Sequence, residues 1–384
     1  MYFAILGKHT QISWEELRYL QPIQFRTYSP EMVFFDTPYP TRISQLAGIV
    51  KRWEIYNYNQ LKEQLIDCPI IGVHDSKSGK QLKSHFGIKR FKLIESLLRT
   101  DREIQQKWKE ILLFQTKEWQ SYGVVTGYQN IKLYEVIDFD KPARSMQVGM
   151  MPAKLTHMMI NIWLTYAAMD TMSNIYDPFC GLGTTILMAN ALGYHAIGSD
   201  INPEHAHKNI NRRKTTRNQT LVASSQQQAA NMYIFQHDVT HPFTEPKIHN
   251  APLIVTEWWL WPIVTTKTTT EQIQNYSKQV EEVYSKFFKN IADCFVTSNT
   301  VRSIGDKNQN TKKPAASSKQ LVANNNLPTI IITIPYYIDK ENHIADHLTT
   351  LTTSLGREHK IIKEIYTRPK QQVGRQIAIF TPQK

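Results

Sequence analysis

The amino-acid sequence predicts an α/β fold: a doubly wound sheet that ends in an antiparallel hairpin and follows a smaller α+β region. Two observations carry this prediction. The run DPFCGLGTT, residues 177–185, follows a short apolar segment and has the glycines and threonines of a tight loop that opens a helix. Around it, apolar strand segments alternate with helical segments, which is typical of parallel strands joined by helices.

The N-terminal region is predicted to be an α+β domain over residues 1–60. Residues 2–6 form an apolar segment typical of a strand, and Ser13 and Glu16 have the spacing of a capping box, which predicts a helix through residue 20. The remaining elements expected here are a helical stretch near 42–48 and strands at 24–27, 32–35 and 50–56.

Residues 61–126 form a second region, which is basic and helix-prone from about 77 to 115. One interpretation is a solvated helix face, and the other is a surface that contacts RNA. Together with two basic residues further along the chain, it supplies the candidate RNA contacts, which are Lys89, Arg90, Lys92, Arg144 and Lys154.

Residues 127–152 are predicted to connect this region to a large domain over 153–384. The domain is expected to begin with a helix over 153–172 and to continue, after the glycine loop, with alternating strands and helices. The later predicted elements are helices at 203–213 and 270–295, strands at 232–235, 253–256, 329–334, 361–366 and 375–380, and a disordered loop near 298–326 that is rich in Ser, Asn, Lys and Gln.

Composition narrows the classes of partner. The 384-residue chain is 41% hydrophobic, and its formal net charge of +12 favours a polyanion as its large partner. A basic enzyme without such a partner is the alternative. Three cysteines without CxxC spacing predict neither a zinc site nor a disulfide framework, and with no leader or membrane-length apolar run we expect a cytoplasmic protein.

The glycine loop indicates a particular nucleotide. A dinucleotide fingerprint would need glycine where Ile186 stands, and a phosphate-binding P-loop would need a lysine that is missing. Instead, Asp177 ends one predicted strand and Asp200 ends the next. Two such carboxylates suit S-adenosylmethionine, because one can lie near its ammonium group and the other can accept its ribose hydroxyls. An ordinary strand–turn–helix would explain the glycines but not both acids.

Several segments together resemble one family, the THUMP-associated branch of Rossmann-like class I methyltransferases, which includes tRNA (guanine-10-N2) methyltransferases. DPFCGLGTT is similar to the family's DPFCGSGT loop. The connector is similar to the segment that precedes that loop in the family. Its matching parts are Gln129-Asn130-Ile131, Lys141-Pro142-Ala143-Arg144-Ser145, Gly149-Met150-Met151-Pro152-Ala153-Lys154-Leu155 and Met159-Ile160-Asn161. Residues 2–20 and the C-terminal YTR and VGRQI runs also resemble family members.

The resemblance implies an N-terminal RNA-binding region with a reduced THUMP-like part, a tRNA or other structured RNA as partner, and no metal. Some members act with a small activating protein, so such a subunit is also an expectation. It further implies the following cofactor-binding residues: Asp177, Phe179, Gly181, Gly183, Thr184, Thr185, Asp200, Ile201, Asp238 and Met150. For Asp238, an ordinary turn aspartate is the alternative.

The catalytic position departs from the family. Where members carry DPPY, this chain has TEWWLWP, residues 256–262. Glu257 can still accept a hydrogen bond from an amine, and Trp258 or Trp259 can stack on a base, but both prolines are absent. The tryptophans could equally pack into the core.

The sequence therefore predicts methyl transfer from S-adenosylmethionine to an exocyclic amine of a base in structured RNA, with guanine N2 of tRNA as the target. The base would be flipped into the pocket beside Glu257. The alternatives are methylation of DNA at adenine N6 or cytosine N4, and a catalytically silent nucleic-acid-binding scaffold.

Overall fold

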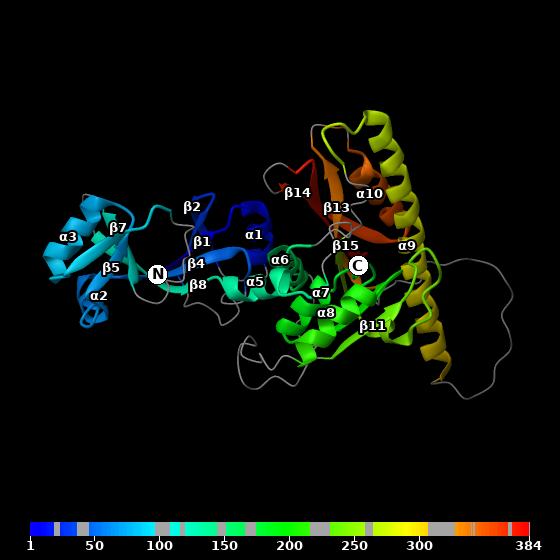
Figure 1. Ribbon diagram of the computed structural model, residues 1–384, viewed down its shortest axis with the longest axis horizontal. Helices are drawn as coiled ribbons and strands as arrows, with labels where there is room; N and C mark the ends of the chain where they lie inside the picture. The colour runs from blue at the N-terminus through cyan, green and yellow to red at the C-terminus, as the bar shows by residue number, and fades with distance from the viewer. Residues whose placement is uncertain are drawn as a thin grey trace. The chain divides into compact units, whose positions relative to one another are not determined.

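The computed structural model divides into two compact units, Met1–Ile131 and Lys132–Lys384, which are described separately below (Figure 1). It describes residues 1–18, 24–36, 46–96, 108–115, 120–143, 151–165, 174–215, 231–257, 264–305, 327–338, 340, 342–367 and 371–383.

The first unit is built on an eight-stranded sheet in its described part, with the strand order β2-β3-β1-β4-β8-β7-β5-β6. Its strands are β1 (Tyr2–Leu6), β2 (Arg26–Ser29), β3 (Met32–Phe35), β4 (Ile49–Tyr56), β5 (Ile70–Val73), β6 (Arg90–Leu93), β7 (Lys109–Gln115) and β8 (Gln120–Tyr128). β4 pairs with β8, so the strands of the predicted regions 1–60 and 61–126 belong to one sheet.

Three apolar clusters make the core in the described part of this unit; one lies among the strands alone, at Phe3, Ile5, Met32 and Trp53, and the other two join helices to the sheet. One joins α1 (Thr10–Leu17) to the β1–β3 side of the sheet through residues such as Leu17, Val33 and Phe35. The other joins α2 (Tyr58–Gln64) and α3 (Ser76–Phe86) to β5, β7 and β8, with Leu61 and Leu82 fully buried. Each helix therefore buries its apolar side on its own half of the sheet.

The predicted capping box at Ser13 and Glu16 is wrong. The helix α1 begins three residues earlier, at Thr10, and both side chains are buried inside it. The Glu16 carboxylate accepts hydrogen bonds from the backbone N–H groups of Ala47 and Gly48, and Ser13 Oγ donates to the His9 carbonyl at 2.9 Å. The S-x-x-E spacing thus serves a contact between α1 and a distant turn.

The basic region 77–115 is only partly helical. The helix α3 is capped by Asp75, whose side chain accepts from Ser78 N at 2.8 Å, and it ends at Gly87 with φ 66°. After α3 come the strands β6 and β7, although the sequence predicts helix over this region. Their apolar residues Phe91 and Ile111 pack on the sheet core, and this burial outweighs the helix propensity of their basic neighbours.

The second unit carries a seven-stranded sheet in its described part, with the order β11-β10-β9-β12-β13-β15-β14. The strands are β9 (Asn174–Asp177), β10 (His195–Asp200), β11 (Met232–Gln236), β12 (Leu253–Glu257), β13 (Thr329–Tyr337), β14 (Arg357–Tyr366) and β15 (Val373–Pro382). The pairs from β11 to β13 are parallel, and β15 is antiparallel to both neighbours. This confirms the predicted doubly wound sheet with its antiparallel hairpin, a Rossmann-like class I methyltransferase topology.

Helices cover both faces of this sheet. On one face, Ile254 and Ile330 join Phe287 of α9 (Thr270–Gly305) and Leu348 of α10 (Ile344–Ser354) in one apolar cluster. On the other, Gly198 of β10 lies against Ile186 of α7 (Thr184–Ala191). The remaining helices of the unit are α5 (Ile131–Phe139), α6 (Ala153–Trp163), α8 (Glu204–Thr215) and the 3-10 helix η4 (Pro246–Asn250).

Several helical segments of this unit differ from the sequence prediction. The helix α6 ends at Trp163, before the predicted end at 172, and residues 166–173 lie outside the described residues. The connector contains α5, and α10 fills the gap before β14. The helix α9 continues to Gly305, so the first residues of the predicted loop 298–326 are helical, while 306–326 lie outside the described residues. In α10, the threonines that weaken helix propensity are bonded within the helix, as when Thr352 Oγ1 donates to the Leu348 carbonyl at 2.7 Å.

Candidate active site

The glycine loop lies at the carboxyl end of β9, in the middle of the sheet. Gly181 has φ 47° and Gly183 has φ 79°, and residues other than glycine rarely adopt such left-handed backbone conformations. Gly183 is also the N-cap of α7. The loop is tied to the neighbouring strand because Cys180 N–H donates to the Ser199 carbonyl at 2.9 Å. Thr184 and Thr185 follow as the buried first turn of α7, so the N–H groups at this helix end face the carboxyl edge of the sheet.

Asp177 is the buried acid of the site, with 2% of its surface exposed. Its Oδ1 accepts hydrogen bonds from Thr256 Oγ1 at 2.6 Å and from Phe179 N–H at 3.1 Å. Burial raises the pKa of Asp177 to about 7, the charge of Asp200 adds to the rise, and the hydrogen bonds from Thr256, Thr185 and Phe179 oppose it. Asp177 is therefore partly protonated near neutral pH, and a cation beside it would favour its charged form.

Asp200 ends the adjacent strand β10, and backbone donors hold its carboxylate. Gly181 N–H donates to Oδ2 and Asn202 N–H donates to Oδ1, each at 2.9 Å. Each oxygen keeps a further lone pair, which suits it to accept a pair of hydroxyl groups. The next residue, Ile201, is an apolar side chain that is 67% exposed, which offers an uncovered surface for a flat ring.

Glu257 ends β12, the strand on the other side of β9. Its carboxylate forms an ion pair with Arg375 Nε from β15, and both side chains are almost completely buried. The sequence predicts the position of Glu257 but not this pair, since Arg375 enters only as part of the VGRQI run. The predicted stacking residues Trp258 and Trp259 lie outside the described residues.

The hydrogen bond from Thr256 to Asp177 joins the carboxyl ends of β12 and β9, which carry the predicted amine acceptor and a predicted cofactor acid. Thr256 immediately precedes Glu257 and lies on β12, whereas Asp177 lies on β9. The predicted amine acceptor and the predicted cofactor acids therefore lie at the carboxyl ends of three adjacent strands, β10, β9 and β12. Open α/β sheets bind ligands at this edge.

Asp238 follows β11, as predicted, but its carboxylate caps its own turn. Its Oδ1 accepts from Thr240 N–H at 2.9 Å and from Thr240 Oγ1 at 2.8 Å. Burial raises the pKa of Asp238, but the hydrogen bonds from Thr240 and the charges of His241 and His237 outweigh it and leave the pKa below its ordinary value. These contacts are those of a turn aspartate, and its role toward an adenine amine stays a prediction.

Two further residues hold the connector against the glycine loop. Lys141 is 5% exposed and donates a hydrogen bond to Thr184 Oγ1. Asn209 of α8 donates to the Leu182 carbonyl at 2.9 Å, and its Oδ1 accepts from Ala143 N–H, also at 2.9 Å. Sequence reasoning assigns neither residue a role, although the KPARS run that begins at Lys141 is the pattern that could have pointed to it.

The predicted RNA contacts are spread over the chain. Lys89, Arg90 and Lys92 are exposed in and beside β6 of the first unit, and Lys154 is half-buried in α6 of the second. Arg144 and the predicted cofactor residue Met150 lie outside the described residues. Within the described residues, no helix has the length and apolarity to cross a membrane, and no group of three or more His, Cys, Asp or Glu side chains could hold a metal ion.

Comparison with known proteins gives one family match. Residues 50–212, less than half of the chain, match a DNA methylase family model (N6_N4_Mtase). The match contains the connector, the glycine loop, Asp200 and most of α8. A search of curated proteins found no sequence match.

Similar solved structures include TrmN from Thermus thermophilus, at 11% identity and TM-score 0.48, with 98% of each chain covered. A possible methylase from Clostridium difficile 630 is similar at 10% identity and TM-score 0.44, with 100% of this chain and 98% of that chain covered. A magnesium protoporphyrin IX methyltransferase (ChlM) from Synechocystis PCC 6803 with bound SAH is similar at 11% identity and TM-score 0.32, with 65% and 93% covered. The fold assignment above rests on the strand order of this chain.

The residues present fit S-adenosylmethionine. The loop has glycines at its positive-φ positions, a buried acid suits the ammonium group, and a second acid with two backbone donors suits the ribose hydroxyls. The exposed Ile201 suits one face of the adenine. Together with the strand order and the family match, this donor set supports S-adenosylmethionine as the cofactor of a methyltransferase.

Proposed function

We propose that the protein transfers a methyl group from S-adenosylmethionine to an exocyclic amine of a base in structured RNA, with guanine N2 of a tRNA as the target. The observation that carries the proposal is the alignment of Asp200, Asp177 and Glu257 at three adjacent strand ends, linked by the 2.6 Å hydrogen bond from Thr256 to Asp177. An acceptor for the amine thus adjoins the acids suited to the cofactor.

The chemistry needs alignment and charge stabilisation more than strong acid–base groups. When bound, S-adenosylmethionine supplies an electrophilic methyl group on its sulfonium. Asp177 and Asp200 would hold the cofactor, which would leave as S-adenosylhomocysteine, and the amine would be positively charged after it accepts the methyl group until it releases a proton to water. Glu257 would accept a hydrogen bond from the amine and stabilise this charge, and Trp259 would stack on the base.

Arg375 would set the orientation of the Glu257 carboxylate. Its Nε binds Oε1 of Glu257, and this charge-assisted bond fixes that oxygen of the acid. A glutamate held in this way is a positioned acceptor and not a mobile base. The proposed role of Arg375 is therefore positioning.

Two features of the chain favour RNA as the substrate. The connector resembles the segment that precedes the cofactor loop in tRNA methyltransferases, and residues 2–20 of the N-terminal α+β region resemble the opening of the same proteins. A specific observation also supports a second candidate, since the matched family is one of DNA methylases whose name refers to N6 and N4 amines. DNA methylation at adenine N6 or cytosine N4 is therefore the second proposal.

The test is to incubate the protein with S-adenosylmethionine carrying a radiolabelled methyl group and, separately, with unmodified tRNA and duplex DNA. The nucleic acid is then digested and the labelled nucleoside is identified. Labelled N2-methylguanosine from tRNA is the expected result. Label only in N6-methyladenosine or N4-methylcytidine deoxynucleosides would favour the second proposal. Cofactor binding with no label in either substrate would favour a scaffold or a missing activating subunit.

A further inference from the structure

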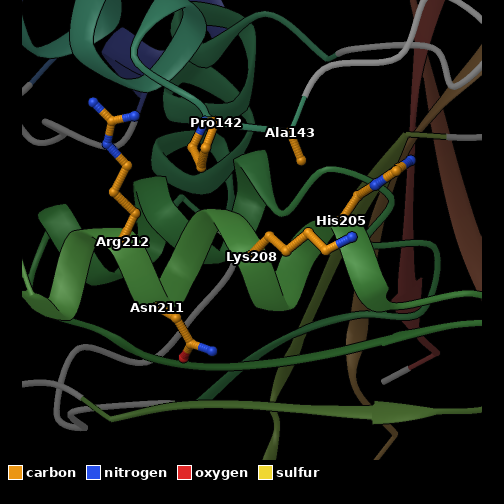
Figure 2. Close-up of a pocket in the computed structure, with 6 residues that line it drawn as sticks. All are labelled: Pro142, Ala143, His205, Lys208, Asn211 and Arg212. Carbon is orange, nitrogen blue, oxygen red and sulfur yellow. The ribbon is translucent and has the colours of Figure 1, made fainter.

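A basic pocket lies between the connector and α8, outside the site described above. Pro142 and Ala143 form its connector side, and four residues of α8 complete it: His205, Lys208, Asn211 and Arg212 (Figure 2). The pocket thus has two cationic side chains, an imidazole and an amide, and no carboxylate among its lining residues.

The spacing along α8 concentrates this charge. His205, Lys208 and Arg212 are separated by three and four residues, which places them along one side of a helix over about 10 Å. Figure 2 shows Lys208 running along the helix toward His205, while Arg212 leaves the helix on the side of Pro142. Such a row fits an extended anion better than a single small one.

The ion pair that Lys208 forms leaves the pocket able to accept a ligand. Lys208 has a carboxylate neighbour in Glu204, at 3.7 Å, but 63% of the Lys208 side chain and 72% of the Glu204 side chain are exposed. An exposed pair of this kind contributes little and can exchange for a phosphate.

The pocket is also fixed to the candidate active site. Asn209, on the same helix, is bonded both to Ala143 of the pocket wall and to Leu182 of the glycine loop. The helix begins four residues after Asp200. A strand of nucleic acid held in the pocket would therefore be held at a set position relative to the loop that carries the cofactor residues.

We propose that this pocket binds two successive phosphates of the nucleic-acid substrate, next to the nucleotide that is methylated. Lys208 and Arg212 would neutralise the phosphate charge, and His205 would bond a phosphate oxygen. This inference rests on the proposed function, because it assigns part of the substrate contact to the methyltransferase unit itself. It adds residues of α8 to the RNA contacts predicted from the sequence.

The test measures the affinity of the whole protein for tRNA and for duplex DNA at several salt concentrations. Wild type is compared with the double variant Lys208→Gln/Arg212→Gln. Loss of two phosphate contacts is expected to weaken binding tenfold or more and to reduce the slope of log affinity against log salt by about one to two. The affinity for S-adenosylmethionine and the melting temperature should stay at wild-type values, since both side chains are exposed.

The matched control is Lys286→Gln. Lys286 lies on α9 of the same unit, is about as exposed as Lys208 and likewise pairs with a glutamate four residues earlier. This control should leave the affinity and slope nearly unchanged, and Lys208→Arg should retain the wild-type slope.

Three results would overturn the inference. A double variant that methylates and binds nucleic acid as Lys286→Gln does would show that the pocket makes no contact, while the proposed function stands. Inhibition of wild-type binding by millimolar inorganic phosphate, equal in the double variant, would place the phosphate contact elsewhere. If wild type binds S-adenosylmethionine but neither nucleic acid, the proposed function fails together with the pocket.

Discussion

Glu257 lies in a buried ion pair with Arg375. A substitution of either residue can therefore change the stability of the protein as well as its activity. Removing one member of a buried pair leaves an uncompensated charge, which costs about 3–5 kcal/mol of stability. An alanine at position 257 would therefore test folding and catalysis together. A glutamine keeps an oxygen for Arg375 and removes only the negative charge.

We expect Glu257→Gln to lower methyl transfer by at least about 100-fold, because the charge that stabilises the developing ammonium is lost. Glu257→Gln should retain cofactor affinity. Glu257→Ala should also abolish transfer, but it should lose stability as well, because Arg375 is left buried without its acid. Asp200→Ala should instead weaken cofactor binding directly. Single-turnover transfer and calorimetric binding of S-adenosylmethionine separate these effects. Near-normal turnover of Glu257→Ala would show that the amine-acceptor assignment is wrong.

Asp177 links the site to pH. Its pKa rises from an ordinary value of 3.8 to about 7 in the folded protein, mainly through burial. Below pH 3.8 Asp177 is protonated in both the folded and the unfolded chain, so its ionisation does not change the free energy of unfolding. Between pH 3.8 and 7 it is ionised in the unfolded chain but still mostly protonated in the folded one. The contribution of Asp177 to stability therefore falls as pH rises through this window.

The variant Asp177→Asn should flatten this fall, so that it loses less stability than wild type between pH 4 and pH 8. Urea unfolding at both pH values measures the difference. The same variant should bind S-adenosylmethionine more weakly, because a neutral amide cannot pair with the ammonium group. An unchanged pH dependence would mean that Asp177 ionises normally in the folded chain.

At the scale of elements, the sheet of the first unit contains a fully buried charge cluster. Glu110 of β7 binds Lys51 of β4 at 2.5 Å, His74 at 2.8 Å and Tyr128 of β8 at 3.1 Å, and the Lys51 and Glu110 side chains are completely buried. The cluster connects the β1–β4 half of the sheet to the β5–β8 half. It therefore fixes how the two halves pair.

We expect Lys51→Met to lower the free energy of unfolding of the first unit by about 3–5 kcal/mol, because Glu110 then remains charged and buried. The double variant Lys51→Met/Glu110→Leu should recover most of this loss, since it removes both charges together. Denaturant unfolding of the two variants and wild type checks the prediction. A double variant less stable than the single one would show that the contacts of Glu110 with His74 and Tyr128 stabilise the unit even without Lys51.

The elements that the sequence could predict are those with a strong local pattern. The strands β9, β10 and β12 are short apolar runs that end in an acidic residue, and each ends within one residue of its predicted end. The helix α10 is missed because its threonines lower helix propensity, and only its packing on α9 and β14 explains it. The capping box fails because the same two side chains make a tertiary contact.

In the candidate site, too, the residues with a local sequence pattern could be predicted and those that depend on tertiary contacts could not. Asp177, Asp200 and Glu257 could be found because each directly follows an apolar strand. Their partners Thr256, Arg375, Lys141 and Asn209 could not be assigned, because they come from elements far apart in sequence and only the fold brings them together. The pocket on α8 is hidden in sequence for the same reason, since two of its six lining residues come from the connector.

On the scale of the whole molecule, the chain consists of two units that each have their own sheet and apolar core. The residues that fit the cofactor all belong to the second unit, whereas the Lys51–Glu110 pair belongs to the first. Cofactor binding should therefore shift the unfolding transition of the second unit, and substitution of Lys51 or Glu110 should shift that of the first.

We expect S-adenosylmethionine to stabilise only the transition of the second unit, by about 2.7 kcal/mol at 100 times its dissociation constant. Differential scanning calorimetry with and without the cofactor measures this, and Lys51→Met serves as the control because it should lower only the other transition. A single transition that shifts in both experiments would show that the two units unfold together.

The order of strands in the second sheet also bears on how the protein is made. In the chain β14 precedes β15, yet in the sheet β15 lies between β13 and β14 and pairs with both. While a ribosome is still synthesising residues 373–382, β14 has no neighbouring strand to join and β13 has an uncovered edge. The methyltransferase unit therefore cannot complete its sheet during most of its translation, and a message truncated before Val373 would yield a chain with an exposed apolar strand that invites aggregation.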